Sequence, residues 1–403
     1  MTRGPGLTRA VLMGMIFAGS ATVAPAQTPA DDVKTVVRGN NEFALDLYAK
    51  LRADDGNLFI SPYSVSTALA MTWAGARGET ARQMSEVLHF SLEQERLHPA
   101  FAALLAADEA KPEQSGYELH LANALWGQTG YDFLPEYLEL TKRHYGAGLR
   151  EVDFAKAAEQ ARQTINAWAE GETRQKIKNL LTPANMTPPP TLVLTNAIYF
   201  KGDWASRFDP DHTSTGDFHL NQRDKVRVPL MHHSGEFAYA ATENVEILEL
   251  PYEGDRLSMV VLLPTKADGL ASLEKSLDRK TLERWLEKLE RKTVRVTLPR
   301  FKLESRCDLA TTLKAMGMTD AFGGAADFSG MTGRRELFIS QVIHQTCVEV
   351  NEEGTEAAAA TAVTMKRTSR HASFAADHPF LFLIRDTNAG GLYFIGRVAN
   401  PAQ

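Results

Sequence analysis

Cysteine is scarce in this sequence: Cys307 and Cys347 are the only two among 403 residues. Neither has the spacing of a metal ligand, so we expect no metal site. A disulfide is permitted in an exported protein, but two cysteines cannot establish one. The paired and the free states of these thiols therefore both stay open at this stage.

Positive charge is also in short supply. Lys and Arg number 44 against 50 Asp and Glu, which gives a formal net charge of −6. An acidic balance argues against nucleic acid as a partner. The stretch LDRKTLERWLEKLERK has a basic side, but its acids are interleaved with its bases, so we interpret it as a solvated helix face.

The motifs of common catalytic sites are absent. The sequence has no Gly-x-Ser-x-Gly elbow, no His-Glu-x-x-His and no phosphate-binding glycine loop. His232 and His233 form the one histidine pair, and neighbours on a strand point to opposite faces, which makes them a poor chelate. We therefore expect that the protein is not an enzyme and that it holds no cofactor.

No internal repeat, charge block or Pro/Gly-rich boundary divides the chain. Apolar residues are 44% of the total and are spread evenly, enough for a large core. At this length two domains would be the usual expectation, yet the composition fits one large mixed domain equally well.

The N-terminus has the order of a secretory signal. The segment MTRGPGLTRAVLMGMIFAGSATVAPAQ places two arginines before an apolar run and ends that run near Ala24, Pro25 and Ala26. The run is shorter than the roughly 20 residues that span a bilayer. We interpret residues 1–26 as a signal peptide cleaved after Ala26, with a buried N-terminal helix as the alternative. Cleavage would remove two arginines and no acid, taking the net charge from −6 to −8. The mature protein is expected to be periplasmic or extracellular, without membrane association.

The spacing of apolar residues changes along the chain. Apolar positions recur at helical spacing in residues 33–53 and 157–181. A further helix is expected over residues 62–90, and it is apolar nearly all round. From residue 191 the period shifts towards two, which predicts strands. These strand candidates are residues 191–204, 225–240, 245–252, 257–264, 294–305 and 337–354. The sequence therefore predicts an α+β fold with large, mainly antiparallel sheets.

The segment EVNEEGTEAAAATAVTMKRTSRHASFAADHPF is unusual in joining small residues to a basic tract. A flexible linker between domains is one interpretation. The apolar strand pattern that follows is too short to be a domain, so the segment interrupts a fold. At period two, its face from Thr355 to Met365 carries no charge, and residues 355–365 include no proline to break a ladder of hydrogen bonds. Gly354 can supply a hinge, because it adopts backbone angles that other residues avoid.

Five stretches occur in a distinctive order: NLFISPYSVSTALAM, LTNAIYFKGDW, VPLMHH, HQTCVEVNEEGTEAAAATA and ADHPFLFLIRDTNAGGLYFIGRVANP. Together they make the chain resemble the serpin family over nearly all of its length after the signal. The resemblance implies a single serpin domain at residues 27–403, with three β-sheets, eight to nine helices and an exposed reactive loop at about residues 354–376. It also implies a bacterial exported member of the inhibitory type.

The resemblance implies a suicide-substrate mechanism. A serine protease, or in some cases a cysteine protease, attacks the loop and becomes trapped as a covalent 1:1 complex when the loop inserts into the main sheet. The implied loop hinge comprises Glu352, Glu353, Gly354, Thr355, Glu356, Ala357, Ala358, Ala359 and Ala360. We expect a monomer, and no cluster of Lys and Arg resembles a heparin site. A non-inhibitory serpin acting as a binding protein or chaperone is the alternative.

The reactive bond follows from the family's usual spacing after the hinge, which places it between Thr368 and Ser369. A threonine there suits elastase-like and subtilisin-like enzymes. Arg367 lies one residue upstream, so the bond between Arg367 and Thr368 is a secondary site for trypsin-like enzymes, whose pocket carboxylate prefers Arg or Lys.

Polar and aromatic residues elsewhere also match the family. Ser61, Ser64, Asn196 and His344 match the shutter, a polar cluster beneath the point where the central strands separate. Trp204 matches the breach, where insertion starts. These residues also fit a helix cap, satisfied core polar groups and a core aromatic. The helix around Ile165 and Trp168 matches one that lies across the main sheet.

Overall fold

The computed structural model describes residues 1–2, 29–109, 116–146, 148–355 and 372–403. Within them, the helices are α1 (Pro29–Leu51), α2 (Pro62–Trp73), α3 (Gly78–Val87), α4 (Gln94–Glu109), α5 (Pro135–Tyr145), α6 (Ala158–Glu172), α7 (Leu270–Ser276), α8 (Arg279–Leu286), α9 (Ala310–Met316) and α10 (Ser329–Thr332). Three short 3-10 turns lie at η2 (Pro183–Met186), η3 (Pro210–His212) and η4 (Asp320–Phe322).

The strands of the described residues form two sheets. A nine-stranded sheet has the order β1-β15-β14-β8-β7-β6-β9-β13, with β5 paired to β6. A six-stranded sheet has the order β10-β11-β4-β2-β3, with β12 paired to β4. The strand bounds are β1 (Leu58–Ile60), β2 (Tyr117–Gln128), β3 (Leu149–Val152), β4 (Leu192–Asp203), β5 (Ser214–His219), β6 (Lys225–Ala241), β7 (Val245–Pro251), β8 (Leu257–Pro264), β9 (Glu290–Pro299), β10 (Phe301–Asp308), β11 (Gln341–Val350), β12 (Gly354–Thr355), β13 (Ala372–Ala375), β14 (Phe380–Asp386) and β15 (Leu392–Val398).

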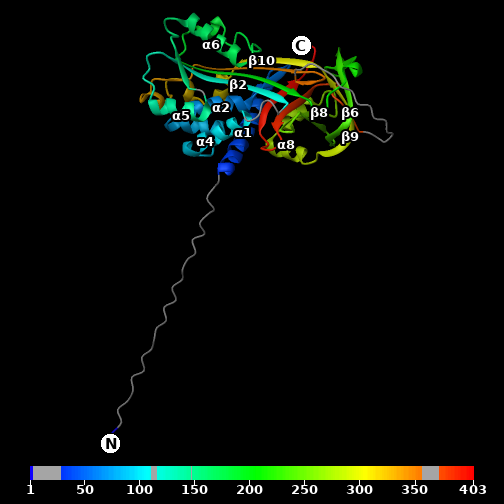
Figure 1. Cartoon of the computed structure of the whole chain (residues 1–403), viewed down its shortest axis with the longest axis horizontal. Helices are drawn as coiled ribbons and strands as arrows, with labels where there is room; N and C mark the ends of the chain where they lie inside the picture. Colours follow the sequence, from blue (N-terminus) through cyan, green and yellow to red (C-terminus); the bar gives the residue numbers. More distant parts are fainter. Residues whose placement is uncertain (3–28, 110–115, 147, 356–371) are drawn as a thin grey trace.

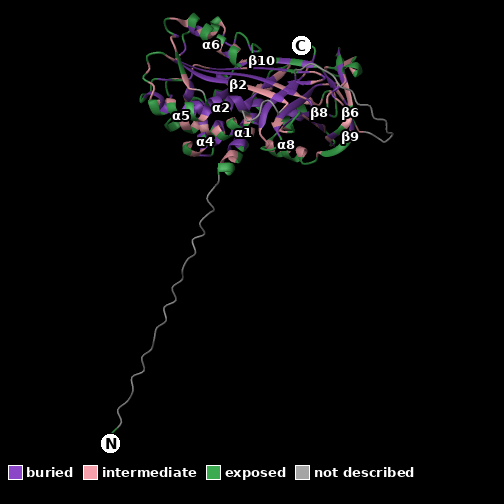
Figure 2. Ribbon diagram, in the orientation of Figure 1, coloured by how far each residue is buried: buried purple, intermediate pink, exposed green. Residues whose placement is uncertain are grey.

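The helices lie on both sides of the six-stranded sheet. Helix α6 lies on one side, and α1, α2, α4 and α5 lie on the other (Figure 1). Helix α2 packs between the two sheets, against β15 of one and against β2 and β4 of the other. All its residues are buried, as its apolar sequence predicts (Figure 2). It therefore contacts the centre of the six-stranded sheet through β2 and β4.

The α+β prediction is confirmed, but the expected number of sheets differs. We expected three sheets, and the hydrogen bonds of the described residues connect two. Strand β6 explains the difference, because it runs unbroken through residues 225–241. Its first residues pair with β5, its middle pairs with β9 and its last residues pair with β7, so two expected sheets are joined in one. The described residues also hold ten α-helices where we expected eight to nine, the last being the four-residue α10.

Two long elements predicted from the sequence are divided. The helix expected over residues 62–90 ends at Trp73 and resumes at Gly78. A side chain at Gly75 would place its Cβ 2.2 Å from Met331, so this stretch is pressed against a neighbour and glycine is required there. The strand expected over residues 294–305 is likewise divided into β9 and β10 at Arg300.

No disulfide joins the two cysteines. Cys347 on β11 pairs with Glu304 across the ladder, whereas Cys307 on β10 pairs with His344. The two side chains are therefore three positions out of line on neighbouring strands and point to opposite faces, which prevents a disulfide. Burial raises the pKa of the Cys307 thiol to about 12, which makes it a poor nucleophile. None of the described helices is both long and apolar enough to cross a bilayer.

Candidate functional site

The six-stranded sheet has a parallel boundary at its centre, between β11 and β4, and another at its edge, between β2 and β3. The pairing runs from Gln341 opposite Val193 to Cys347 opposite Tyr199. On either side, β10 pairs with β11 and β2 pairs with β4, both antiparallel. We call the boundary between β11 and β4 the seam. Beyond its last pair, the two-residue strand β12 pairs antiparallel with the end of β4.

The chain between β11 and β12 is a tight turn that returns the backbone to the seam. The Asn351 side chain accepts hydrogen bonds from the N–H groups of Glu353 (3.1 Å) and Gly354 (3.3 Å). Gly354 has φ +151°, and a Cβ there would lie 2.1 Å from the carbonyl oxygen of Gly202. Only glycine allows so close an approach of two backbones. Thr355 is completely buried, with its hydroxyl 3.1 Å from that of Tyr252. Two residues of the hinge, Gly354 and Thr355, thus already lie in the sheet.

Trp204 lies beside this turn, at the end of β4. Its indole N–H donates to the carbonyl of Asn351 (3.0 Å), and its backbone N–H donates to the carbonyl of Glu353 (2.8 Å). The ring stacks on Tyr252 with centroids 4.7 Å apart and planes 10° apart. Trp204 is 1% exposed, so any rearrangement of the hinge would change the surroundings of this buried indole.

Glu352 anchors the turn to the nine-stranded sheet. Its buried carboxylate accepts hydrogen bonds from Arg300 (Nε, 2.6 Å) and from the hydroxyl of Thr213. Its carbonyl accepts the N–H of Phe208 (2.8 Å). The Arg300 side chain is 44% exposed, so solvent screens this ion pair on one side. The remaining hinge residues, Glu356 to Ala360, lie outside the described residues.

Beneath the middle of the seam lies a cluster of buried polar side chains: Ser61, Ser64, Asn123, Asn196 and His344. Ser61 caps the N-terminus of α2, accepting the N–H of Ser64 (3.3 Å). The Asn196 amide donates to the hydroxyl of Ser64 and to the side-chain oxygen of Asn123. The His344 ring is hydrogen-bonded to the Asn196 side-chain oxygen across the seam. Four of these residues were predicted from the sequence, and the fold brings all four into one network.

The hydrogen bonds of His344 define its protonation state. Its Nε2 accepts the backbone N–H of Ser61 (3.1 Å), so its Nδ1 carries the proton and donates to the oxygen of Asn196. Complete burial lowers the pKa of His344 to about 3. A second ring proton would face the N–H of Ser61, placing two donors against each other. The neutral imidazole is therefore part of the structure of the closed seam.

Asn123 was not predicted as part of this cluster. It is 8% exposed and lies directly opposite Asn196, which in turn lies opposite His344, so the three form one row across β2, β4 and β11. The signal in the sequence is a lone amide within the strand LHLANALWG. Finding it requires knowing which residue of β4 it faces, and that pairing joins positions 73 residues apart.

Helix α6 covers the opposite face of the seam, as predicted for the helix around Ile165 and Trp168. Ile165 is completely buried, and the Trp168 ring packs edge-on against Trp126 of β2 at 5.4 Å. The same apolar cluster includes Val193 of β4 and Ile343 of β11, which lie on the two sides of the seam. Opening the seam therefore disturbs an apolar layer on one face and the polar row on the other.

The predicted reactive bonds cannot be placed in the structure. Arg367, Thr368 and Ser369 lie outside the described residues. Among the residues that are described, no group of three or more His, Cys, Asp or Glu side chains could hold a metal ion. His232 and His233 instead contact hydroxyl groups: those of Thr297 and Ser214 for His232, and that of Ser206 for His233.

Comparison with known proteins gives a single family. The family model described as "Serpin (serine protease inhibitor)" matches residues 38–401. Human leukocyte elastase inhibitor is 44% identical over 375 residues, covering 90% of this chain and 98% of that protein. Human Serpin B3 is 41% identical over 392 residues, covering 92% of this chain and 100% of that protein. These relatives are vertebrate proteins and give no support to the bacterial origin expected from the sequence.

Solved structures agree with these relatives. Serpin48 of the insect Tenebrio molitor, described as a highly specific serpin, superposes with a TM-score of 0.82 at 34% identity, covering 91% of this chain and 98% of that one. Uncleaved ovalbumin gives a TM-score of 0.83 at 32% identity, covering 91% and 100%. The predicted fold is thereby confirmed. A family described as protease inhibitors also agrees with the prediction that the chain is not an enzyme.

Proposed function

Because the chain belongs to the serpin family, we propose that it inhibits serine proteases as a suicide substrate, trapping them when its cleaved loop inserts into the seam. The observation that carries this proposal is β12. Its two residues already pair with β4 at the open end of the seam, and Thr355 is buried there. Insertion would therefore extend a strand that has already begun.

Continuing the pairing of β12 with β4 gives the register of the inserted strand. Gly354 lies opposite Asp203 and Thr355 opposite Gly202, so Thr361 would lie opposite Asn196. Thr361 would then join the row of Asn123, Asn196 and His344, where its hydroxyl could bond to groups freed when the seam opens. Alanines 357 and 359 would lie on the same face, where their small side chains fit against a packed core.

The direction of β12 supplies a driving force. The inserted strand would be antiparallel to β4, and also to β11, because β4 and β11 are parallel to each other. One parallel boundary would become two antiparallel ones. Parallel pairing is slightly less stable per residue, and the intact sheet leaves possible ladder bonds unmade. The intact protein would then store free energy that cleavage of the loop releases.

Insertion explains how a protease would be trapped. An extended strand from Gly354 to Thr368 spans about 45–50 Å at about 3.3 Å per residue. An enzyme whose nucleophile is bonded to the carbonyl carbon of Thr368 would be pulled across the molecule. Acyl-enzyme hydrolysis depends on an oxyanion hole held in place within fractions of an ångström, so mechanical distortion stops the reaction.

The proposed specificity is broad. Elastase-like and subtilisin-like enzymes would cleave the loop at the bond between Thr368 and Ser369. A relative that is named for inhibition of leukocyte elastase supports this choice. Trypsin-like enzymes would use the bond between Arg367 and Thr368. Mass spectrometry of the peptide released with each complex tests both assignments. A fragment beginning at Ser369 is expected with elastase, and another start with every inhibited enzyme contradicts the assignment.

The test of the mechanism is a covalent 1:1 complex with a serine protease that survives denaturing electrophoresis. If serine and cysteine proteases all yield only cleaved protein, the alternative of a non-inhibitory binding protein or chaperone is favoured. As part of the proposal we retain export after cleavage at Ala26. Intact mass of protein from its native source should then correspond to a chain beginning at Gln27, and a retained Met1 would contradict it.

A further inference from the structure

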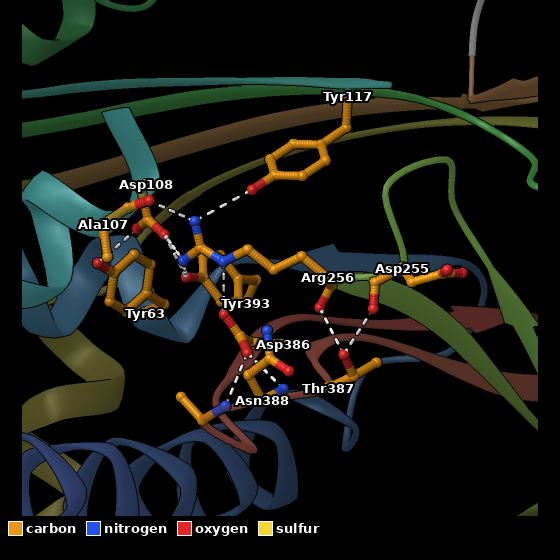
Figure 3. A network of polar contacts seen from close by, with 11 residues as sticks. Tyr63, Ala107, Asp108, Tyr117, Asp255, Arg256, Asp386, Thr387, Asn388 and Tyr393 are labelled. Atoms are coloured by element: carbon orange, nitrogen blue, oxygen red, sulfur yellow. Dashed lines mark hydrogen bonds and ion pairs between the residues drawn. The ribbon is translucent and has the colours of Figure 1, made fainter. Parts of the chain in front are cut away.

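A buried ionic network lies apart from the hinge and is centred on Arg256, at the start of β8 (Figure 3). The guanidinium donates to Asp108 (Nη2, 2.6 Å), to Asp386 (Nε, 2.8 Å) and to the hydroxyl of Tyr117 (Nη1, 3.1 Å). The Asp108 and Asp386 side chains are 6% and 4% exposed. These contacts join α4, β14 and β2 through one side chain.

Most of the network is anchored away from the six-stranded sheet. Besides Asp108, Arg256 contacts the carbonyl of Ala107 at the end of α4. The Asp386 carboxylate also accepts the N–H groups of Asn388 (2.8 Å) and Ala389 (2.7 Å), which fixes the turn that follows β14. These contacts hold the guanidinium to α4 and to β14 of the nine-stranded sheet. Tyr117 is its contact on the six-stranded sheet among the residues drawn in Figure 3.

Tyr117 connects the network to the hinge. It lies at the start of β2, directly opposite Gly202 of β4, and Gly202 lies opposite Thr355 of β12. Tyr117, Gly202 and Thr355 thus form one row across the sheet at the open end of the seam. The ring centroids of Tyr117 and Phe200 are 6.3 Å apart, and those of Phe200 and Tyr252 are 5.1 Å apart. The hydroxyl of Tyr252 in turn contacts that of Thr355.

Tyr63 and Tyr393 connect the same network to the polar row beneath the seam. Their hydroxyls both bond to Asp108, and their rings are in contact at 4.6 Å. The carbonyl of Tyr393 accepts the hydroxyl of Ser61 (2.8 Å), whose backbone N–H donates to His344. The network therefore supports the N-terminus of α2, on which the closed seam rests.

Opening the seam for a new strand requires a displacement of about 4.8 Å, the spacing between neighbouring strands. If β4 moves, β2 moves with it, because the two are paired over their whole length. Arg256 cannot follow, since it is held by α4 and β14. A hydrogen bond of 3.1 Å does not survive a shift of that size. The contact between Arg256 and Tyr117 must therefore break when the β2–β4 side of the sheet moves.

We propose that Arg256 is a positioning residue that latches β2 to the body of the molecule through Tyr117 and so keeps the seam closed until the loop is cut. This inference rests on the proposed function for its purpose, but the latch itself is a property of the intact protein. Its strength is that of one hydroxyl–guanidinium contact, which is modest enough to be released during insertion.

The test is hydrogen exchange of the β4 and β11 amides along the seam, in the intact protein without protease. Tyr117→Phe removes one hydroxyl and keeps the ring. We expect it to speed seam exchange about two- to tenfold, the range for loss of one hydrogen bond. Arg256→Met should speed seam exchange at least as much, because it also removes the counter-ion of two buried carboxylates. Tyr117→Phe should add nothing further in that background, because the two residues act as a unit. If Arg256→Met does not fold, Arg256→Lys takes its place in the cycle.

The matched control is Tyr48→Phe. Like Tyr117, Tyr48 has a hydroxyl in a buried ionic network: it donates to Glu274, which pairs with Arg397 at 3.1 Å, but none of these three residues lies in the six-stranded sheet. It should lower the melting temperature comparably and leave seam exchange as in the wild type. Seam exchange unchanged in Tyr117→Phe, or raised equally by Tyr48→Phe, overturns the latch. A raised exchange in a protein that forms no protease complex supports the latch while contradicting the proposed function.

Discussion

The two sheets formed by the described residues differ in the side chains that join their central strands. In the nine-stranded sheet, β8 and β14 pair antiparallel, with residues such as Leu262 and Leu381 directly opposite each other and completely buried. In the six-stranded sheet, β11 and β4 pair parallel, and His344 and Asn196 take the corresponding central positions. One boundary is sealed by apolar contacts, and the other is bridged by a polar row.

The difference concerns what happens when a boundary opens. Separating Leu262 from Leu381 would expose apolar surface, at a cost of about 25 cal/mol per Å², and would free no polar side chain that could form a new hydrogen bond. Separating His344 from Asn196 frees polar groups that a polar newcomer can satisfy. A sheet that must admit a strand therefore benefits from polar groups at its centre, where stability alone would favour leucine.

Cleavage of the loop is the sharpest test of this comparison. We expect a cut within residues 365–370 to raise the melting temperature on the order of 20 °C. Insertion would form about ten new ladder hydrogen bonds, each stabilising the protein by about 0.5–1.5 kcal/mol. Each kcal/mol of added stability raises the melting temperature by roughly 2–4 °C. Calorimetry of intact and cleaved protein measures it. Nicking an ordinary loop leaves stability equal or lower, so similar melting of the two forms would contradict insertion.

Thr355→Arg should displace β12, which is already buried in the sheet, and so remove the start from which the inserted strand would extend. The side chain would be buried against Tyr252 without a counter-ion, at a cost of about 3–5 kcal/mol. We expect the variant to be cut by the protease without forming a stable complex, which electrophoresis distinguishes. Thr215→Arg is the control, because Thr215 is an exposed position on β5 of the nine-stranded sheet. Normal complex formation by Thr355→Arg would mean that this position is not buried during inhibition.

The seam shows which features the sequence can predict. The strands, α2 and α6 follow from apolar spacing, and Ser61, Ser64, Asn196 and His344 follow from a family resemblance. Asn123 and Tyr117 did not follow, because their roles depend on which residues of β4 they face. The merging of two expected sheets through β6 also escaped prediction, since an unbroken strand pattern does not say which partner each half will choose.

Acidification should weaken the seam. The pKa of His344 in the folded protein is lowered to about 3 by burial, against about 6.5 in the unfolded chain. Its stabilising contribution is therefore complete above pH 6.5 and is lost as the pH falls from 6.5 towards 3, at about 1.4 kcal/mol per pH unit. Denaturant unfolding of the intact protein between pH 7 and pH 4.5 measures this slope.

His344→Gln separates this contribution from that of other histidines. Burial also lowers the pKa of His98, to about 4, so the wild-type slope contains both groups. The variant should keep the part of the stability-against-pH slope that is due to His98 and lose the part that is due to His344. Equal slopes in the variant and the wild type would show that the protonation of His344 is not linked to folding.

Leu262→Ala should leave unchanged the difference in the free energy of unfolding between the intact and the cleaved protein. Leu262 is completely buried, between Leu381 of β14 and Ile247 of β7, so its truncation leaves a cavity that costs about 2–5 kcal/mol. In the proposed mechanism the nine-stranded sheet does not take part in insertion, so both forms should lose the same free energy of unfolding, within about 0.5 kcal/mol. Chemical denaturation of both forms of the variant and of the wild type provides the four values required. A cleaved form that loses much less than the intact one would mean that the boundary between β8 and β14 also rearranges, and the division between a fixed sheet and an opening sheet would have to be abandoned.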